Sequence, residues 1–175
     1  MSLDGFCDHT AMMADDELHD HYTALLRSAG AILYGRITYQ LMESYWPLVV
    51  KNPTGDPSMD DFAMSMQDVP KIVFSRTLKQ VEWDSARLAK GSVEEEILAL
   101  KQQPGKDIFV GSPGLIVAAM KLNLVDEYQL CVHPVIAGRG LPLFHHINDS
   151  VMLNLIQTKT FGSGAILLCY ELKKE

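Results

Sequence analysis

Residues 31–41 read Ala-Ile-Leu-Tyr-Gly-Arg-Ile-Thr-Tyr-Gln-Leu (AILYGRITYQL), and the pattern changes in the middle of this stretch. Its first four residues form a short apolar run, which is typical of a buried strand, and Gly35 ends the run. Ile37 and Leu41 then recur at the spacing of one helix face. A strand, a glycine turn and a helix in this order predict one half of a β-α-β unit.

The same succession of strand and helix recurs through the first two thirds of the chain. Asp15 or Asp16 is a suitable N-cap for the first helix, Gly30 a suitable stop, and Ser92-Val93-Glu94-Glu95 is a capping box for a later helix. Helices are expected over residues 15–29, 36–46, 59–67, 93–103 and 113–123. Strands are expected over residues 31–34, 71–74, 81–88, 107–111, 127–136, 151–161 and 165–172. Three prolines between residues 47 and 57 predict a surface loop there.

The order of these elements predicts an α/β fold in a single domain that covers residues 1–175. Alternating strands and helices imply parallel neighbouring strands with helices on both faces of the sheet. Gly162-Ser163-Gly164 joins the last two strands as a hairpin, so the final third is expected to be antiparallel. We therefore expect one mixed, mainly parallel sheet flanked by helices and closed by an antiparallel C-terminal hairpin.

The composition limits the classes of partner. The chain has 175 residues, of which 47% are hydrophobic and 21% charged, so a globular protein is expected. Its net charge of -7 and its lack of a basic run argue against a nucleic-acid surface. No apolar run approaches the ~20 residues that span a bilayer, Asp4 and Asp8 interrupt any signal peptide, and the three cysteines are widely spaced. A cytoplasmic protein with no nucleic-acid or membrane partner is expected.

Three turns that follow predicted strands carry residues suited to a phosphate. In an open α/β sheet, ligands bind at the carboxyl ends of the strands, where helix N-termini present free N–H groups. The candidate binding residues in these turns are Gly35, Arg36, Thr38, Ser75, Arg76, Gly111, Ser112 and Gly114. Ser112 and Pro113 also suit the N-cap and first position of a helix. Each turn alone is also compatible with an ordinary loop, but one ligand-binding edge explains all three.

Two arginines at separate strand ends favour a phosphorylated dinucleotide. An arginine fork pairs well with a phosphate, and a 2′-phosphate distinguishes NADP from NAD. The sequence shows neither the Gly-x-Gly-x-x-Gly turn nor the acidic ribose-binding residue of an NAD site. Arg76 with Ser75 is the better candidate for the 2′-phosphate, and Arg36 for the same group or the pyrophosphate. NADPH is therefore the expected cofactor.

Six segments of the chain resemble the hallmark segments of one family. They are Ser2-Leu3-Asp4-Gly5-Phe6, Leu33-Tyr34-Gly35-Arg36-Ile37-Thr38-Tyr39, Ile72-Val73-Phe74-Ser75-Arg76-Thr77-Leu78, Asp107-Ile108-Phe109-Val110-Gly111-Ser112, residues 132–144 and residues 158–164. In this order they resemble the C-terminal reductase domain of the bacterial riboflavin-biosynthesis deaminase/reductase and its stand-alone dihydrofolate-reductase-like relatives. The resemblance implies a dihydrofolate-reductase-like fold that binds NADPH on the three turns, often as a homodimer. It also places Asp4 beside the nicotinamide and the substrate pocket.

The chain departs from this family pattern at two places. Relatives begin with a strand before the segment at residues 2–6, and here only Met1 precedes it, so the first family strand lies before residue 1 or the chain begins differently. The usual Gly-Gly pair at the third turn is Gly111-Ser112, and a serine is tolerated there if its φ angle is not positive.

The resemblance implies an NADPH-dependent reductase of a small heteroaromatic compound, pyrimidine-like or pterin-like, with hydride transfer carried by the cofactor. Asp4 is the candidate catalytic residue, since its carboxyl group is suited to deliver or stabilise one proton. Asp15, Asp16 and Asp20 are alternatives that also suit the start of a helix. The histidines lack the spacing of a metal site, so no metal is expected. Two alternatives stay open: a nucleotide-binding or sensory protein without turnover, and a dimerising structural domain with a vestigial pocket.

Overall fold

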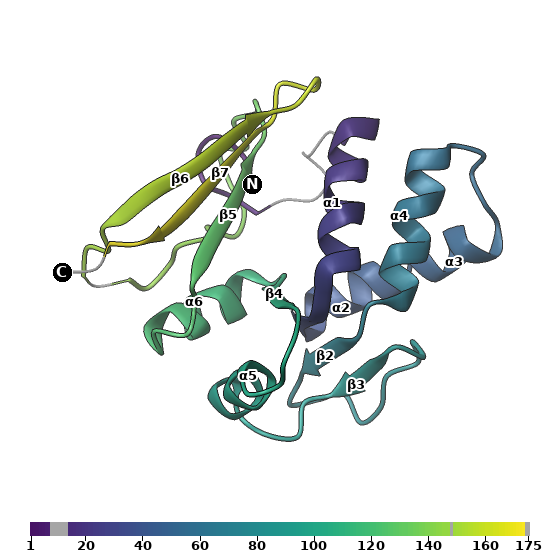
Figure 1. Cartoon of the computed structure of the whole chain (residues 1–175), viewed down its shortest axis with the longest axis horizontal. Coiled ribbons are helices and arrows are strands. Elements are labelled where there is room, and N and C mark those ends of the chain that lie inside the picture. Colours follow the sequence, from purple (N-terminus) through teal and green to yellow (C-terminus); the bar gives the residue numbers. More distant parts are fainter. Residues whose placement is uncertain (8–13, 148, 174–175) are drawn as a thin grey trace.

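Four parallel strands form the sheet that organises the structure, a computed structural model that describes residues 1–7, 14–147 and 149–173 (Figure 1). The strands are β1 (Ala29–Gly35), β2 (Lys71–Phe74), β3 (Ala86–Leu88) and β4 (Asp107–Val110). They lie side by side in the order β3-β2-β1-β4. The helices of this part of the chain are α1 (Asp16–Ser28), α2 (Arg36–Glu43), α3 (Trp46–Lys51), α4 (Pro57–Asp68), α5 (Val93–Lys101) and α6 (Pro113–Lys121). The predicted α/β class and the parallel pairing are confirmed.

β1 lies between β2 and β4, and its alternate residues pack against helices on opposite faces. Ile32 and Tyr34 belong to a core cluster with Leu26 of α1, Tyr39 of α2 and Met66 of α4. The cluster on the other face contains Ala31 and Leu33 of β1. They pack with Ile97 of α5 and Ala119 of α6. Because successive side chains of a strand point to opposite faces, this apolar run fills two layers of the core. The expected placement of helices on both faces is confirmed.

The last third of the chain forms a separate antiparallel sheet. Its strands are β5 (Glu127–Val132), β6 (Leu153–Thr160) and β7 (Ile166–Leu172), in the order β5-β7-β6. The expected C-terminal hairpin is confirmed, but the expectation that these strands continue the parallel sheet is wrong. The end of β5 meets N-terminal residues instead of β4. Ser2 forms a parallel bridge with His133, and the Leu3 N–H donates to the Val135 carbonyl (2.8 Å).

α1 contacts both sheets and thereby connects them (Figure 1). Leu26 joins the core of the parallel sheet. Leu18 packs in a second cluster with residues of the antiparallel sheet and its hairpin, namely Cys131, Phe161, Ala165, Leu167 and Cys169. Asp15 is the N-cap, as predicted, since its Oδ1 accepts from the Leu18 N–H (2.9 Å). Its Oδ2 accepts from the Ser163 N–H (2.5 Å), which ties the hairpin turn to the start of the helix.

Three local predictions differ from the structure. Residues 46–51 form α3 instead of the expected loop, and Pro47 lies in its first turn. A proline is tolerated there because the N–H groups of the first turn have no helical partner. β3 covers only Ala86–Leu88, while the more polar residues before it lie outside the strand. Gly30 lies in β1 instead of ending the helix, and a Cβ there would approach the Lys106 Cβ to 3.2 Å.

A buried lysine joins α4 to the parallel sheet. Lys71, at the start of β2, is 1% exposed. Its Nζ donates to the carbonyl oxygens of Met66 and Val69 and to Ser85 Oγ, and it lies 3.9 Å from the centre of the Trp83 ring. Burial lowers the pKa of Lys71 to about 7. Three acceptors and an aromatic face therefore replace the water that this amine has lost.

We expect Lys71 to make the stability of the protein depend on pH. Its pKa falls from 10.5 to about 7 on folding, so between these values the unfolded chain holds the extra proton. As the pH rises from 7 to 10.5, the free energy of unfolding of the wild type should therefore increase relative to that of Lys71→Met. The increase should reach a few kcal/mol, since one pKa unit corresponds to ~1.4 kcal/mol. Urea unfolding of both proteins near each end of the window measures the difference. Identical pH profiles of the two proteins would contradict it.

Candidate functional site

The three predicted turns lie side by side at one edge of the parallel sheet. β1 pairs in parallel with β2 and with β4, so the carboxyl ends of these strands meet at the same edge. Gly35 ends β1 opposite Phe74, and Ser75 follows β2 immediately. Gly111 follows β4, and its N–H donates to the Leu33 carbonyl of β1 (3.0 Å). The structure thus brings the candidate binding residues of all three turns to one edge.

A hydrogen bond joins the first turn to the third. Ser112 Oγ accepts from the Gly35 N–H (2.9 Å), and Ser112 is 5% exposed. Ser112 occupies the N-cap position of α6 with Pro113 in the first turn, as predicted, but its hydroxyl makes no capping hydrogen bond to that helix. Its φ angle is -124°, so a serine fits where the family pattern has a second glycine.

Gly111 is required by the space around it rather than by a positive φ angle. A Cβ at this position would lie 2.5 Å from Cε1 of Tyr34, whose ring is buried in the core. At Gly114, by contrast, a Cβ would have no other heavy atom of the described chain within 4 Å. The third turn therefore packs tightly against β1 on one side and opens to the surface where α6 begins.

The two helices that begin at this edge lack side-chain caps. α1, α4 and α5 are capped by Asp15, Asp56 and Ser92. α2 and α6 begin after Gly35 and Ser112, and within the described ranges no N-cap side chain accepts from their first N–H groups. Free N–H groups and the positive end of the helix dipole favour an anion. The edge therefore presents two helix N-termini suited to phosphate groups.

Two arginines at the same edge have no carboxylate partner. Arg36 Nη1 donates to Gln40 Oε1 (3.0 Å) within α2. Arg76 is exposed, and it follows Ser75, whose hydroxyl accepts from the Thr77 N–H (3.1 Å) and so fixes the turn. In residues 1–7, 14–147 and 149–173, neither guanidinium group forms an ion pair. Both therefore retain donors for a phosphate.

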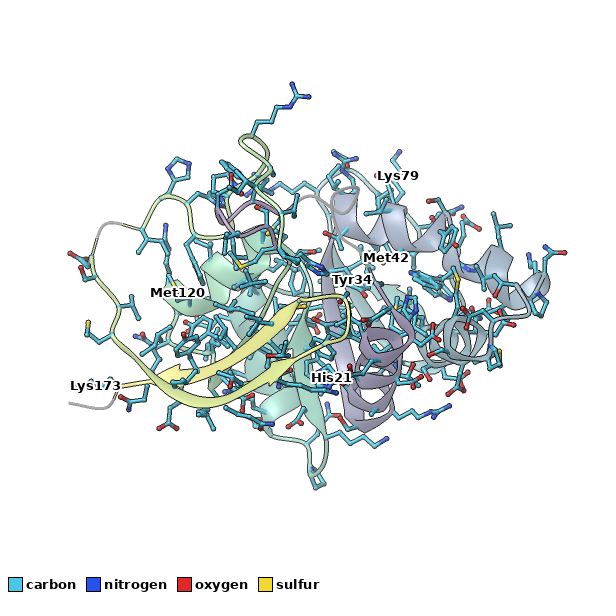
Figure 2. The ribbon with its side chains drawn as sticks, turned by 90° about the horizontal axis from the view of Figure 1, so that it is seen from above. His21, Tyr34, Met42, Lys79, Met120 and Lys173 are labelled. Atoms are coloured by element: carbon cyan, nitrogen blue, oxygen red, sulfur yellow. The ribbon has the colours of Figure 1, made fainter. Side chains whose placement is uncertain are left out.

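Sequence patterns do not predict the hollow that lies between α2 and residues 77–82. Its volume is about 270 Å³, and it is lined by Tyr39, Gln40, Glu43, Thr77, Leu78, Lys79, Gln80, Val81 and Glu82. The Tyr39 hydroxyl accepts from two backbone N–H groups at the end of this segment (3.2 and 3.3 Å), which holds one wall in place. Lys79, one of these lining residues, is labelled in Figure 2. Because these contacts join residues about 40 positions apart, no local motif reveals them.

The end of β3 lies at the same edge but has a different charge pattern. β3 runs parallel to β2, and Lys90 follows it closely. The hollow there is also lined by Arg87, Glu95 and Glu96. Hydrogen bonds from the Arg87 guanidinium lower the pKa of Glu96 to about 2, so the arginine is already matched by an ionised carboxylate. This strand end is therefore less suited to a phosphate than the first three turns.

Asp4 holds the turn that follows β5. Its Oδ1 accepts from Ser2 Oγ (2.6 Å) and from the Ala137 N–H (3.0 Å), and its Oδ2 accepts from the Gly138 N–H (2.8 Å). These hydrogen bonds, that of Ser2 first, lower the pKa of Asp4 to about 2. The carboxylate is therefore ionised near neutral pH, and a catalytic role for Asp4 stays a prediction. Contact between Asp4 and a substrate stays a prediction.

Several of the other candidate carboxylates and histidines have partners of their own. Asp15 caps α1, Asp20 accepts from Ser58 Oγ, and the His19 ring lies 5.5 Å from that of Phe62. Among the residues that the structure describes, no three His, Cys, Asp or Glu side chains gather in a way that would hold a metal ion. No helix in those ranges has the length and apolar character needed to cross a membrane.

Comparisons with known proteins identify similar sequences and structures. The sequence matches the RibD C-terminal domain family over residues 1–167. The uncharacterized protein YyaP of Bacillus subtilis (strain 168) is 34% identical over 174 residues, covering 97% of this chain and 90% of YyaP. A Shewanella sp. PV-4 protein, provisionally assigned to riboflavin biosynthesis, superposes with a TM-score of 0.71 at 19% identity, over 99% of this chain and 95% of that one. A pyrimidine reductase-like protein of Corynebacterium diphtheriae gives 0.66 at 18% identity, over 99% and 89% of the two chains.

We expect Gly111→Ala to destabilise the protein, with Gly114→Ala as its matched control. The new methyl group at residue 111 would overlap the Tyr34 ring, and overpacking of this kind costs about 1–3 kcal/mol. At residue 114 the methyl group meets open space at the start of a helix, so stability should be unchanged or slightly higher. Thermal and urea unfolding of both variants measure this. Equal stability of the two variants would contradict the steric role of Gly111.

We also expect Asp4 to stabilise the fold only above its folded pKa. Its pKa is about 2 in the folded state and ~4 in an unfolded chain, so its contribution is complete above ~pH 4 and is lost as the pH falls through 2. The stability advantage of the wild type over Asp4→Asn at neutral pH should therefore shrink on acidification. Urea unfolding across this range measures it, with Asp84→Asn, at an exposed aspartate outside the turn, as control. A constant difference between wild type and Asp4→Asn would contradict the role of these hydrogen bonds.

Proposed function

We propose that this chain, which belongs to the RibD C-terminal domain family, is an NADPH-dependent reductase of a small heteroaromatic compound, pyrimidine-like or pterin-like. The observation that carries the proposal is one sheet edge where two uncapped helices meet two arginines without carboxylate partners. Family membership and the fold shared with a pyrimidine reductase-like protein support the reaction class.

The residues of this edge fit a phosphorylated dinucleotide. The free N–H groups at the start of α2, which contains Thr38, and at the start of α6 suit the pyrophosphate. Open space at Gly114 lets a ligand approach the backbone closely. Arg76 is our candidate for the 2′-phosphate, with Arg36 for the same group or the pyrophosphate. NADPH, when bound, would supply the hydride.

One further residue acts on this site through the backbone. Ser112 holds Gly35 by a hydrogen bond of 2.9 Å, which fixes the spacing between the N-termini of α2 and α6. We therefore assign a positioning role to Ser112, since two fixed phosphate sites orient a dinucleotide better than one.

A binding protein without turnover is the second candidate function. The hydrogen bonds of Asp4 favour it, because they hold its carboxylate on a turn, and no other donor is identified in the described part of the chain for the proton that follows a hydride. Consumption of NADPH in the presence of pyrimidine or pterin compounds would support the reductase. Saturable NADPH binding with no consumption would support the binding protein.

We expect Arg76→Ala to weaken the binding of NADPH at least tenfold and to leave the binding of NADH unchanged. A hydrogen bond to a charged group contributes about 1.5–3 kcal/mol, and only NADPH carries the 2′-phosphate. Calorimetric titration with each nucleotide measures this, and ligand-induced stabilisation against heat provides a second readout. Arg27→Ala is the matched control, because Arg27 forms an exposed ion pair with Asp61 at the end of α1 that precedes β1. Unchanged NADPH affinity in Arg76→Ala would overturn the assignment of the 2′-phosphate.

A further inference from the structure

The segment that carries Arg76 has little backbone structure of its own. It covers residues 75–83, which follow β2, and we call it the arginine segment. In the described part of the chain, residues 76–82 form no hydrogen bond between one backbone group and another. At the start of the segment, Ser75 Oγ accepts from two N–H groups of the next turn (3.1 and 2.9 Å). Beyond this turn, the position of the segment depends on contacts with side chains.

The hydroxyl of Tyr39 holds the far end of the arginine segment. It accepts from the N–H groups of Glu82 (3.2 Å) and Trp83 (3.3 Å). Tyr39 lies on α2 and is 2% exposed, and burial raises its pKa, so the hydroxyl keeps its proton near neutral pH. Within the described ranges, no other hydrogen bond joins α2 to the arginine segment. One phenol group therefore ties this helix to the end of the segment.

Elsewhere along their length, α2 and the arginine segment are not closely packed. The hollow of about 270 Å³ lies between them. Leu78 and Val81 pack against the core cluster that contains Tyr39, while Lys79 and Gln80 are exposed. The atoms that line a hollow lack partners on one side and so resist displacement less than packed atoms do. The hydrogen bonds of Tyr39 therefore limit how far the segment can move from the helix.

We propose that Tyr39 is a positioning residue that keeps Arg76 within reach of the 2′-phosphate of a bound nucleotide. This role rests on the proposed function, since it assumes a dinucleotide whose pyrophosphate is held at the N-termini of α2 and α6. With the pyrophosphate held there, the distance from the 2′-phosphate to Arg76 depends on where the arginine segment lies relative to α2. The Tyr39 hydroxyl fixes that relation, and hydrogen bonds weaken steeply when a donor is misplaced. Tyr39 therefore contributes, through Arg76, to the discrimination between NADPH and NADH.

Tyr39→Phe tests this role, because phenylalanine retains the buried ring and removes only the acceptor. We expect the variant to bind NADPH about three- to tenfold more weakly and to bind NADH with unchanged affinity. Calorimetric titration with each nucleotide measures both affinities. Tyr128→Phe is the matched control, since Tyr128 is 3% exposed, lies on β5 of the other sheet and has, among the described residues, no partner for its hydroxyl. The control should bind both nucleotides as the wild type does.

Two further measurements separate positioning from a general loss of structure. In the protein without nucleotide, the amides of Glu82 and Trp83 should exchange hydrogen at least about threefold faster in Tyr39→Phe than in the wild type or the control. In the background of Arg76→Ala, Tyr39→Phe should cause no further loss of NADPH affinity, because the group that it positions is already absent. A merely structural effect would weaken the binding of NADH as well.

A wild type that does not bind NADPH would overturn the proposed function and this role with it. If the wild type binds NADPH, an unchanged affinity of Tyr39→Phe overturns the role of Tyr39 alone. Equal losses for NADPH and NADH, or a further loss in the background of Arg76→Ala, overturn it as well. Unchanged exchange of the Glu82 and Trp83 amides would overturn the anchor on which the role depends.

Discussion

The burial of β1 on both faces, with a parallel partner on each edge, is the constraint on which the rest of the structure depends. Leu33 is 0% exposed, and its neighbours along the strand alternate between two helical layers. Parallel partners must return through crossover connections, so the turns after β1, β2 and β4 come to the same edge. The hydrogen bond between Gly35 and Ser112 then fixes the first and third of these turns to each other. The candidate binding edge is therefore a consequence of how the core is built.

The parts of this arrangement that the sequence predicts are those that depend on neighbouring residues. The apolar run of β1, the capping box at Ser92 and the three strand-end turns all have local signals, and the structure contains them. The partner of Ser112 lies 77 positions away, and one partner of Asp4 lies 133 positions away. Such pairings depend on which strands become neighbours, so the sequence offers Asp4 as a candidate catalytic residue without revealing its hydrogen bonds to the turn. The split into two sheets has the same origin, because pairing of the N-terminal residues with the end of β5 has no local pattern.

The binding edge combines two uncapped helix N-termini with two arginines. At other places in the structure such groups are paired, since Asp56 caps α4 and Glu96 accepts from Arg87 (2.6 Å). At the edge, Arg36 and Arg76 have no carboxylate partner within the described ranges. A shortage of acids does not explain this, since the chain holds 22 acidic residues against 15 basic ones. Unmatched donors raise the local electrostatic potential and so favour an anionic ligand at this edge.

The candidate binding edge belongs to the parallel sheet, and α1 is an element that joins this sheet to the antiparallel one. Leu26 packs on the parallel sheet and Leu18 on the antiparallel one, while Asp15 holds the hairpin turn. α6 makes a second connection, because it begins at the binding edge and leads directly into β5. The position of the edge relative to the antiparallel sheet is therefore set by two helices, one through its packing and one through the chain itself.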